Sequence, residues 1–124
     1  MATTSYRAQA QLRQVKRALE WAENTLELSD AEVGSALGAS ARSIARWRED
    51  RHQPASQHVH AAERLLELAH ALDVVFAGDM KRLHAWLHEP IAAFRGRTAL
   101  RMIADGKLDE VLTTLANVDA GAFV

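Results

Sequence analysis

Residues 28–49 constrain the fold more than any other part of the chain, because they carry two sets of helix-boundary signals a few residues apart. Ser29 is a preferred N-cap residue, and Glu32, three positions later, completes the capping-box pattern that begins a helix. Gly38 is suited to the left-handed turn that ends this helix, and Ser40 provides a second N-cap. The segment therefore predicts two short helices joined by a tight turn.

The second of these helices has an apolar face and a basic face. Ile44 and Trp47 lie three residues apart, so both are expected to point inward. The outward face and its cap consist of Ser40, Arg42, Ser43, Arg46 and Arg48. A short turn between two helices and a basic outer face are typical of a helix-turn-helix, whose second helix enters the DNA major groove. An ordinary helical hairpin with solvated arginines is the alternative.

Gly34 lies in the middle of the first helix, where glycine costs about 1 kcal/mol relative to alanine. We therefore expect a crossing helix to approach closely at this position. With Ile44 and the Arg46–Trp47 pair, the pattern resembles the helix-turn-helix of the Xre (phage-repressor-like) family. The resemblance implies that DNA is bound by Ser40, Arg42, Ser43, Arg46 and Arg48. Which arginines read base edges and which hold phosphates is left open.

The chain has 124 residues, of which 48% are apolar, a net charge of −1 and no cysteine. This length suits one or two small domains, and the lack of cysteine excludes disulfides and thiolate metal sites. The near-neutral charge excludes a protein that coats nucleic acid nonspecifically. Any DNA affinity must therefore come from a local basic patch, and a homodimer would present two such patches. Without a long apolar run or an N-terminal secretion signal, a cytoplasmic location is expected.

Apolar residues recur at helical spacing along the whole chain and predict an all-α fold. Besides the capped pair, helices are expected over about 5–24, from Ser56 to Phe76, from Asp79 towards Pro90, from about Thr98 to Gly106, and from Leu108 to a tail at Asp119. No stretch alternates with the period of a strand, so no sheet is expected. The polar stretch around Pro54 separates an N-terminal domain, residues 1–56, from a C-terminal helical domain, residues 57–124.

The second domain carries an ordered series of motifs of its own. In order, they are Trp86–Leu87, Pro90, Phe94, Gly96–Arg97–Thr98, Leu100, Gly106, Val111–Leu112 and Gly121. Phe94 is suited to fill the core, Gly96 to form a positive-φ turn and Thr98 to cap a helix that Gly106 ends. The series resembles the C-terminal domain of the Xre/MbcA/ParS-type antitoxins, with Ala99 standing where the family usually has proline.

This resemblance implies an antitoxin of a type II toxin–antitoxin system. Its partner would be a RES-domain toxin that hydrolyses or phosphorolyses NAD, or uses it for ADP-ribosylation. The antitoxin would bind this toxin through the C-terminal domain, cover the NAD pocket with its terminus, and repress its own operon by binding operator DNA. It would do so as a homodimer within a toxin–antitoxin hetero-oligomer. The residues expected to contact the toxin are Asn117, Asp119, Gly121, Phe123 and Val124.

The chemistry of the chain terminus suits such a pocket. Phe123 would occupy the slot of a nucleotide ring, and the carboxylate of Val124 would pair with an arginine meant for phosphate. The alternative is that Phe123 folds back onto the core of its own chain.

Catalytic and metal-binding patterns are weak. His84 and His88 lie four residues apart, but no third ligand stands at a fixed spacing from them. The chain has no nucleophile elbow, phosphate-binding glycine loop or dinucleotide fingerprint, so we expect no enzyme, no metal and no cofactor. Two other classes stay open: a helix-turn-helix regulator with a dimerisation domain and no toxin, and, much less favoured, a small metal-dependent enzyme.

Overall fold

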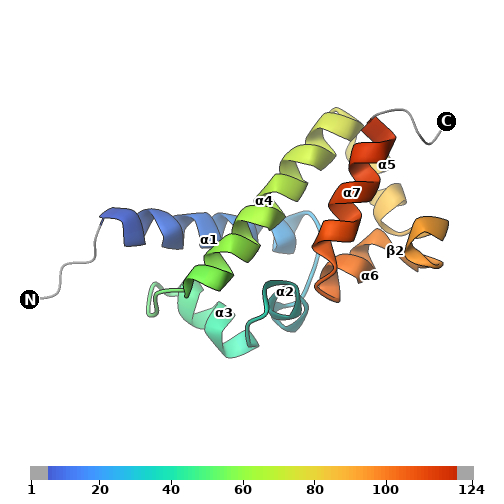
Figure 1. Cartoon of the computed structure of the whole chain (residues 1–124). Coiled ribbons are helices and arrows are strands. Elements are labelled where there is room, and N and C mark those ends of the chain that lie inside the picture. Colours follow the sequence, from blue (N-terminus) through green and yellow to red (C-terminus); the bar gives the residue numbers. More distant parts are fainter. Residues whose placement is uncertain (1–5, 120–124) are drawn as a thin grey trace, which may run out of the picture. The chain divides into compact units, whose positions relative to one another are not determined.

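The computed structural model describes residues 6–119, without the side chains of Val118 and Asp119, and divides into two compact units after Leu66. Both units contain part of α4 (Ser56–Phe76), a single helix of 21 residues that continues across the division (Figure 1). The described elements are almost entirely helical, which confirms the all-α prediction. The division between the units lies inside α4, whereas the polar stretch around Pro54 precedes this helix.

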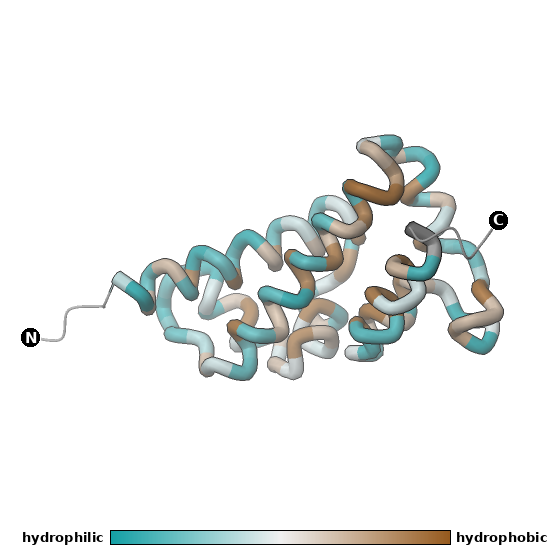
Figure 2. The backbone as a smooth tube through the Cα atoms, turned by 45° about the horizontal axis from the view of Figure 1, so that its top comes forward, coloured by the Kyte–Doolittle hydropathy of each residue, from teal (hydrophilic) through white to brown (hydrophobic). Residues whose placement is uncertain are grey.

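The first unit contains α1 (Tyr6–Asn24), α2 (Asp30–Leu37), α3 (Ala41–Arg48) and the beginning of α4. Hydrophilic and hydrophobic residues alternate along these helices, as expected for helices that bury one face (Figure 2). The larger buried side chains of this unit are Val15, Leu19, Leu26, Leu28, Val33, Leu37, Ile44, Trp47, Val59 and Leu65. The inward orientation predicted for Ile44 and Trp47 is confirmed.

The turn between α2 and α3 is built from the predicted caps. The hydroxyl of Ser29 accepts a hydrogen bond from the Glu32 amide at 3.2 Å, and the Glu32 carboxylate accepts one from the Ser29 amide at 3.0 Å. Gly38 ends α2 with a φ of 72°, a left-handed conformation that glycine adopts without a steric penalty. The hydroxyl of Ser40 accepts a hydrogen bond from the Ser43 amide at 3.1 Å and begins α3.

The close approach at Gly34 has a different partner from the one expected. A Cβ atom on Gly34 would collide with the carbonyl oxygen of Ala39, in the turn that follows α2. The amide of Ala39 donates a hydrogen bond to the Gly34 carbonyl at 2.7 Å, which holds the turn over the end of the helix. The prediction of a crossing helix at this position is therefore wrong, because the backbone of the turn itself fills the space.

The second unit contains the rest of α4, α5 (Met80–Leu87), α6 (Ala99–Ala104) and α7 (Leu108–Asp119). Between α5 and α6 the chain forms β1 (Pro90–Ile91), the 3-10 turn η1 (Ala92–Phe94) and β2 (Arg97–Thr98). The two strands pair antiparallel, with Pro90 opposite Thr98 and Ile91 opposite Arg97. The expectation of no sheet is wrong to this small extent, since a two-residue strand is too short to show an alternating pattern.

The motif residues of this unit have the structural roles predicted for them. Phe94 is buried with 2% of its surface exposed, and Gly96 adopts a positive φ of 83°. The hydroxyl of Thr98 accepts a hydrogen bond from the Arg101 amide at 3.0 Å and caps α6, whose first residue is the buried Ala99. Arg95 also adopts a left-handed conformation, with a φ of 58°, which the sequence did not indicate.

Candidate functional site

The side of α3 that faces away from the core presents polar and cationic groups, from the Ser40 cap to Arg46 in the last turn. Ser40 and Arg42 are exposed, and Ser43 and Arg46 are half-buried. The Ser40 hydroxyl lies 3.2 Å from that of Ser43, so the two form a small polar cluster at the helix N-terminus. Within residues 6–119, neither Arg42 nor Arg46 takes part in an ion pair. Both guanidinium groups are therefore available to an anionic partner.

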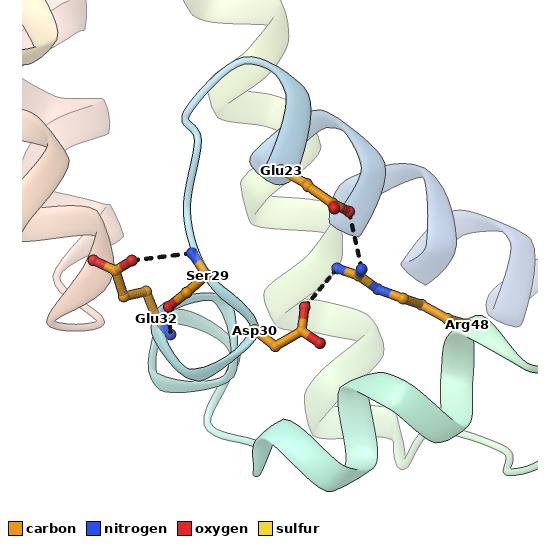
Figure 3. Close-up of polar contacts among 5 residues, drawn as sticks. All are labelled: Glu23, Ser29, Asp30, Glu32 and Arg48. Carbon is orange, nitrogen blue, oxygen red and sulfur yellow. Dashed lines mark hydrogen bonds and ion pairs between the residues drawn. The ribbon is translucent and has the colours of Figure 1, made fainter.

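Arg48, at the end of α3, is in a different situation from Arg42 and Arg46. Its Nη1 lies 2.9 Å from Oε2 of Glu23 in α1, and its Nη2 lies 2.9 Å from Oδ1 of Asp30 in α2 (Figure 3). We refer to these three residues as the Arg48 cluster. The sequence pattern groups Arg48 with the other outward cations, and nothing in it indicates either carboxylate partner.

The acidic residues that follow α3 are also paired. Asp50 lies 2.9 Å from Nζ of Lys16 in α1, and Glu49 lies 3.1 Å from Nη1 of Arg51. In a count of charged residues along the sequence, these carboxylates offset the arginines of α3. In the structure, each carboxylate is paired with a different cation. The charge that α3 presents without a partner is consequently that of Arg42 and Arg46.

A histidine that sequence analysis did not assign supports the inner face of α3. The ring of His58 in α4 lies 5.1 Å from that of Trp47, and its Nε2 lies 3.2 Å from the carbonyl oxygen of Gly38. Trp47 itself is buried, with 1% of its surface exposed. His58 therefore joins α4 to both the turn and α3, a contact across the chain that local spacing does not reveal.

The second unit has a groove of about 620 Å³ with a mixed polar and apolar lining, which we call the α5 groove. It is lined by the end of α4, by α5, by the β1–η1 segment and by one residue of α7: Val74, Val75, Phe76, Arg82, Trp86, Glu89, Pro90, Ile91, Ala92, Ala93 and Thr114. The rings of Phe76 and Trp86 are 5.8 Å apart, and the Arg82 guanidinium lies 5.9 Å from the centre of the Phe76 ring. Polar and charged side chains therefore lie beside aliphatic and aromatic ones in this lining.

A smaller hollow of about 350 Å³, which we call the α7 groove, lies between α4 and α7 of the same unit. Its lining residues are Glu67, His70, Ala71, Val74, Val75, Leu112, Leu115 and Ala116. Val74 and Val75 line both grooves, and Val74 leaves 54% of its surface exposed. Val74 is therefore an exposed apolar side chain that the two hollows share.

Only part of the predicted toxin-contacting segment falls within the structure. Asn117 is exposed near the end of α7, and Asp119 is the last residue of that helix. Gly121, Phe123 and Val124 lie outside the described residues. The two residues that are placed belong to the same helix as Leu112 and Ala116 of the α7 groove.

The histidine pair consists of His84 in α5 and His88, the residue that follows the last residue of this helix. The Nδ1 atom of His88 lies 2.8 Å from the carbonyl oxygen of His84, and the two rings stack with centroids 6.5 Å apart. In residues 6–119 no group of three or more His, Cys, Asp or Glu side chains is arranged to hold a metal ion. The helices over the same range include none that is long and apolar enough to cross a membrane.

The second unit has known counterparts. Residues 71–121 match the family model described as the antitoxin Xre/MbcA/ParS C-terminal toxin-binding domain. Over 101 residues the chain is 33% identical to the mycobacterial cidal antitoxin MbcA of Mycobacterium tuberculosis and Mycobacterium bovis, which covers 80% of this chain and 86% of the relative. It also resembles a chain in the crystal structure of the M. tuberculosis MbcT–MbcA toxin–antitoxin complex, with a TM-score of 0.54 and 28% identity, covering 91% of this chain and 96% of that one.

The matched domain and the all-α fold define an antitoxin of a toxin–antitoxin system. The chain belongs to the Xre/MbcA/ParS family of antitoxins, as the motif series of its second half predicted. Both grooves lie mainly within the matched residues 71–121, and the α5 groove lies entirely within them.

Proposed function

We propose that this chain binds and neutralises a cognate toxin through its second unit and binds operator DNA through α3. The observation that carries the first part is the relation to MbcA over most of both chains, together with the solved complex of MbcA with MbcT. The test is copurification of the chain with the product of the adjacent gene. If the adjacent gene product is not retained, a DNA-binding regulator without a toxin partner becomes the better description.

We further propose that the toxin is a RES-domain protein that consumes NAD or uses it for ADP-ribosylation. In this proposal the terminus inhibits the toxin by occupying its NAD pocket. Phe123 stacks in the pocket, and the Val124 carboxylate pairs with a cationic group there. Asn117 and Asp119 lie at the base of this terminus, and Gly121 allows the backbone to turn into the pocket. An assay of NAD consumption by the partner, with and without this chain, tests this part independently of binding.

The α5 and α7 grooves are the surface on which we propose that the toxin docks. The α5 groove lies wholly within the matched toxin-binding domain, and the exposed Val74 lines both hollows. Burying such an apolar side chain against a partner stabilises the complex.

Replacing Val74 with arginine is expected to weaken toxin binding by about tenfold or more, because a cation would then be buried in an apolar contact. Calorimetric titration of the toxin with the variant measures this. Since Val74 is 54% exposed, the melting temperature should change little. Met80→Arg is the matched control, because Met80 is 48% exposed in the same unit and lines neither groove. Unchanged affinity in Val74→Arg would place the toxin elsewhere.

For DNA, the unpaired Arg42 and Arg46 are the proposed contacts, with Ser40 and Ser43 holding a phosphate at the start of α3. Arginine suits both phosphates and guanine edges, and a helix N-terminus favours an anion. A homodimer would place two such faces on successive half-sites of an operator, one helical turn apart.

Substituting Arg46 with alanine should weaken binding to the DNA upstream of the gene by about tenfold. It should also reduce the slope of log affinity against log salt concentration by about one, because about one counterion fewer is released. Fluorescence anisotropy at several salt concentrations measures both quantities. Toxin neutralisation should stay intact. Lys81→Ala, which removes one exposed cation from the second unit, is the control and should leave DNA affinity unchanged. If Arg46→Ala instead loses both activities, the residue supports folding rather than DNA binding.

A further inference from the structure

The Arg48 cluster joins three helices through one side chain. Glu23 belongs to the last turn of α1, Asp30 is the first residue of α2, and Arg48 is the last residue of α3. Both terminal nitrogens of the guanidinium group are 2.9 Å from a carboxylate oxygen (Figure 3). The planar guanidinium fork places one nitrogen near each carboxylate, which the single ammonium of lysine cannot do. The buried Nε and Nη2 atoms of Arg48 have no hydrogen-bond partner among the described residues, so Asp30 is held as an ion pair and not by a directed hydrogen bond.

Charge around Arg48 also disfavours a contact with DNA. One guanidinium and two carboxylates give the cluster a net charge of −1, so a phosphate approaching Arg48 would meet two carboxylates as well. The side chain of Arg48 is 31% exposed, and those of Glu23 and Asp30 are 54% and 43% exposed. By contrast, Arg42 and Arg46 have no ion pair among the residues that the structure describes.

The position of the cluster complements the other anchors of α3. The Ser40 cap holds the beginning of this helix, and the buried Trp47 holds its inner face. Arg48 holds the end of the helix, where the pair between Lys16 and Asp50 makes a second link to α1. An error in the direction of α3 would displace Arg42 and Arg46 together, because both belong to the same short helix.

We propose that Arg48 is a positioning residue for DNA binding: it fixes α3 against α1 and α2 through Glu23 and Asp30, and does not itself contact the nucleic acid. This inference rests on the proposed operator binding by Arg42 and Arg46. It separates the basic residues of α3 into two that bind and one that orients them, although all three look alike in the sequence.

Variants of the cluster and a matched control test the proposal on the full chain. Arg48→Met removes the cation and keeps the length of the side chain, and Arg46→Met is its matched control. The double variant Glu23→Gln with Asp30→Asn removes both partners and leaves Arg48 charged. DNA affinity is measured by anisotropy over a range of salt concentrations, and the melting temperature is measured for each variant by circular dichroism.

A positioning role predicts that Arg48→Met lowers DNA affinity by about threefold to tenfold with the salt slope unchanged, whereas Arg46→Met lowers the slope by about one ion. The double variant should lose affinity to the same extent, even though it makes the protein more positive. Adding Arg48→Met to it should cause little further loss, because one interaction has already been removed. Arg48→Lys, which keeps the charge without the fork, should fall between wild type and Arg48→Met.

A direct DNA contact by Arg48 predicts different changes in DNA affinity and in salt slope. The double variant would then bind DNA more tightly, since two negative charges have gone, and Arg48→Met would reduce the salt slope. Either result overturns the proposal while leaving operator binding in place. If the wild-type chain does not bind the upstream DNA at all, operator binding and positioning both fail. The melting temperatures then still report whether Arg48 and its two carboxylates are coupled in the fold.

Discussion

Replacing Gly34 with alanine is expected to destabilise the first unit by about 3 kcal/mol, although alanine is intrinsically the better helix former by about 1 kcal/mol. The added Cβ would collide with the carbonyl oxygen of Ala39. This oxygen belongs to backbone that is held in place by the hydrogen bond from the Ala39 amide to the Gly34 carbonyl, at 2.7 Å. The turn must therefore move, and with it the cap that begins α3.

Urea unfolding followed by circular dichroism measures this loss. Ser35→Ala on the same helix is the control, because Ser35 is exposed and the substitution should be neutral or slightly stabilising. Gly38→Ala separates two causes: nothing lies within 4 Å of the added Cβ, so only the positive φ of 72° opposes it, at about 1 kcal/mol. A Gly34→Ala chain as stable as wild type would show that the turn is free to shift.

The helix boundaries of this chain could be predicted because their signals are local. Ser29 and Glu32 are three residues apart, and the hydrogen bonds they form depend on that spacing alone. The same holds for Thr98, whose hydroxyl accepts from the amide three residues later. A local residue pattern of this kind is therefore sufficient to predict where a helix begins.

The cause of the close approach at Gly34 could not be predicted. A glycine inside a helix indicates a lack of space but does not say what occupies it. The occupant is the backbone of Ala39, and it reaches Gly34 because Gly38 turns the chain back over the helix end. The small strand pair of the second unit could not be predicted for a related reason, because a strand of two residues is too short to show an alternating pattern.

The candidate DNA-binding face was predicted as a set of residues but not as a set of roles. Sequence spacing places Arg42, Arg46 and Arg48 on or near one side of a helix. The structure distinguishes them through Glu23, which is 25 positions away from Arg48 and belongs to another helix. No spacing rule connects residues so far apart, because only the packing of α1 against α3 brings them together.

The grooves of the second unit could not be predicted from the sequence either. Their lining comes from four separate elements, and Val74 looks in the sequence like one more apolar residue of a long helix. What distinguishes Val74 is its exposure of 54%, a property of the assembled unit. The motif series, by contrast, was sufficient to identify the family, because it records structural positions such as Phe94, Gly96 and Thr98.

Deleting residues 121–124 is expected to raise the antitoxin concentration needed for half-inhibition of NAD consumption by about 100-fold or more. Burying the Phe123 ring contributes roughly 2–3 kcal/mol, and a charge-assisted bond from the Val124 carboxylate contributes roughly 1.5–3 kcal/mol. Together these correspond to roughly two and a half to four orders of magnitude in affinity. The deletion leaves in place every buried core side chain that the structure describes, so the shortened chain is expected to fold.

Comparison of inhibition with binding makes this experiment specific to a blocking terminus. The shortened chain should still bind the toxin through the grooves of the second unit, more weakly than wild type, while toxin activity continues in the complex. Phe123→Leu is the milder variant, because leucine keeps the apolar volume and loses the aromatic face, and it should inhibit to an intermediate degree. Val74→Arg should show the reverse pattern, since its terminus is intact and its docking surface is not. If the shortened chain inhibits at the same concentration as the full chain, contacts of the second unit alone must block the toxin.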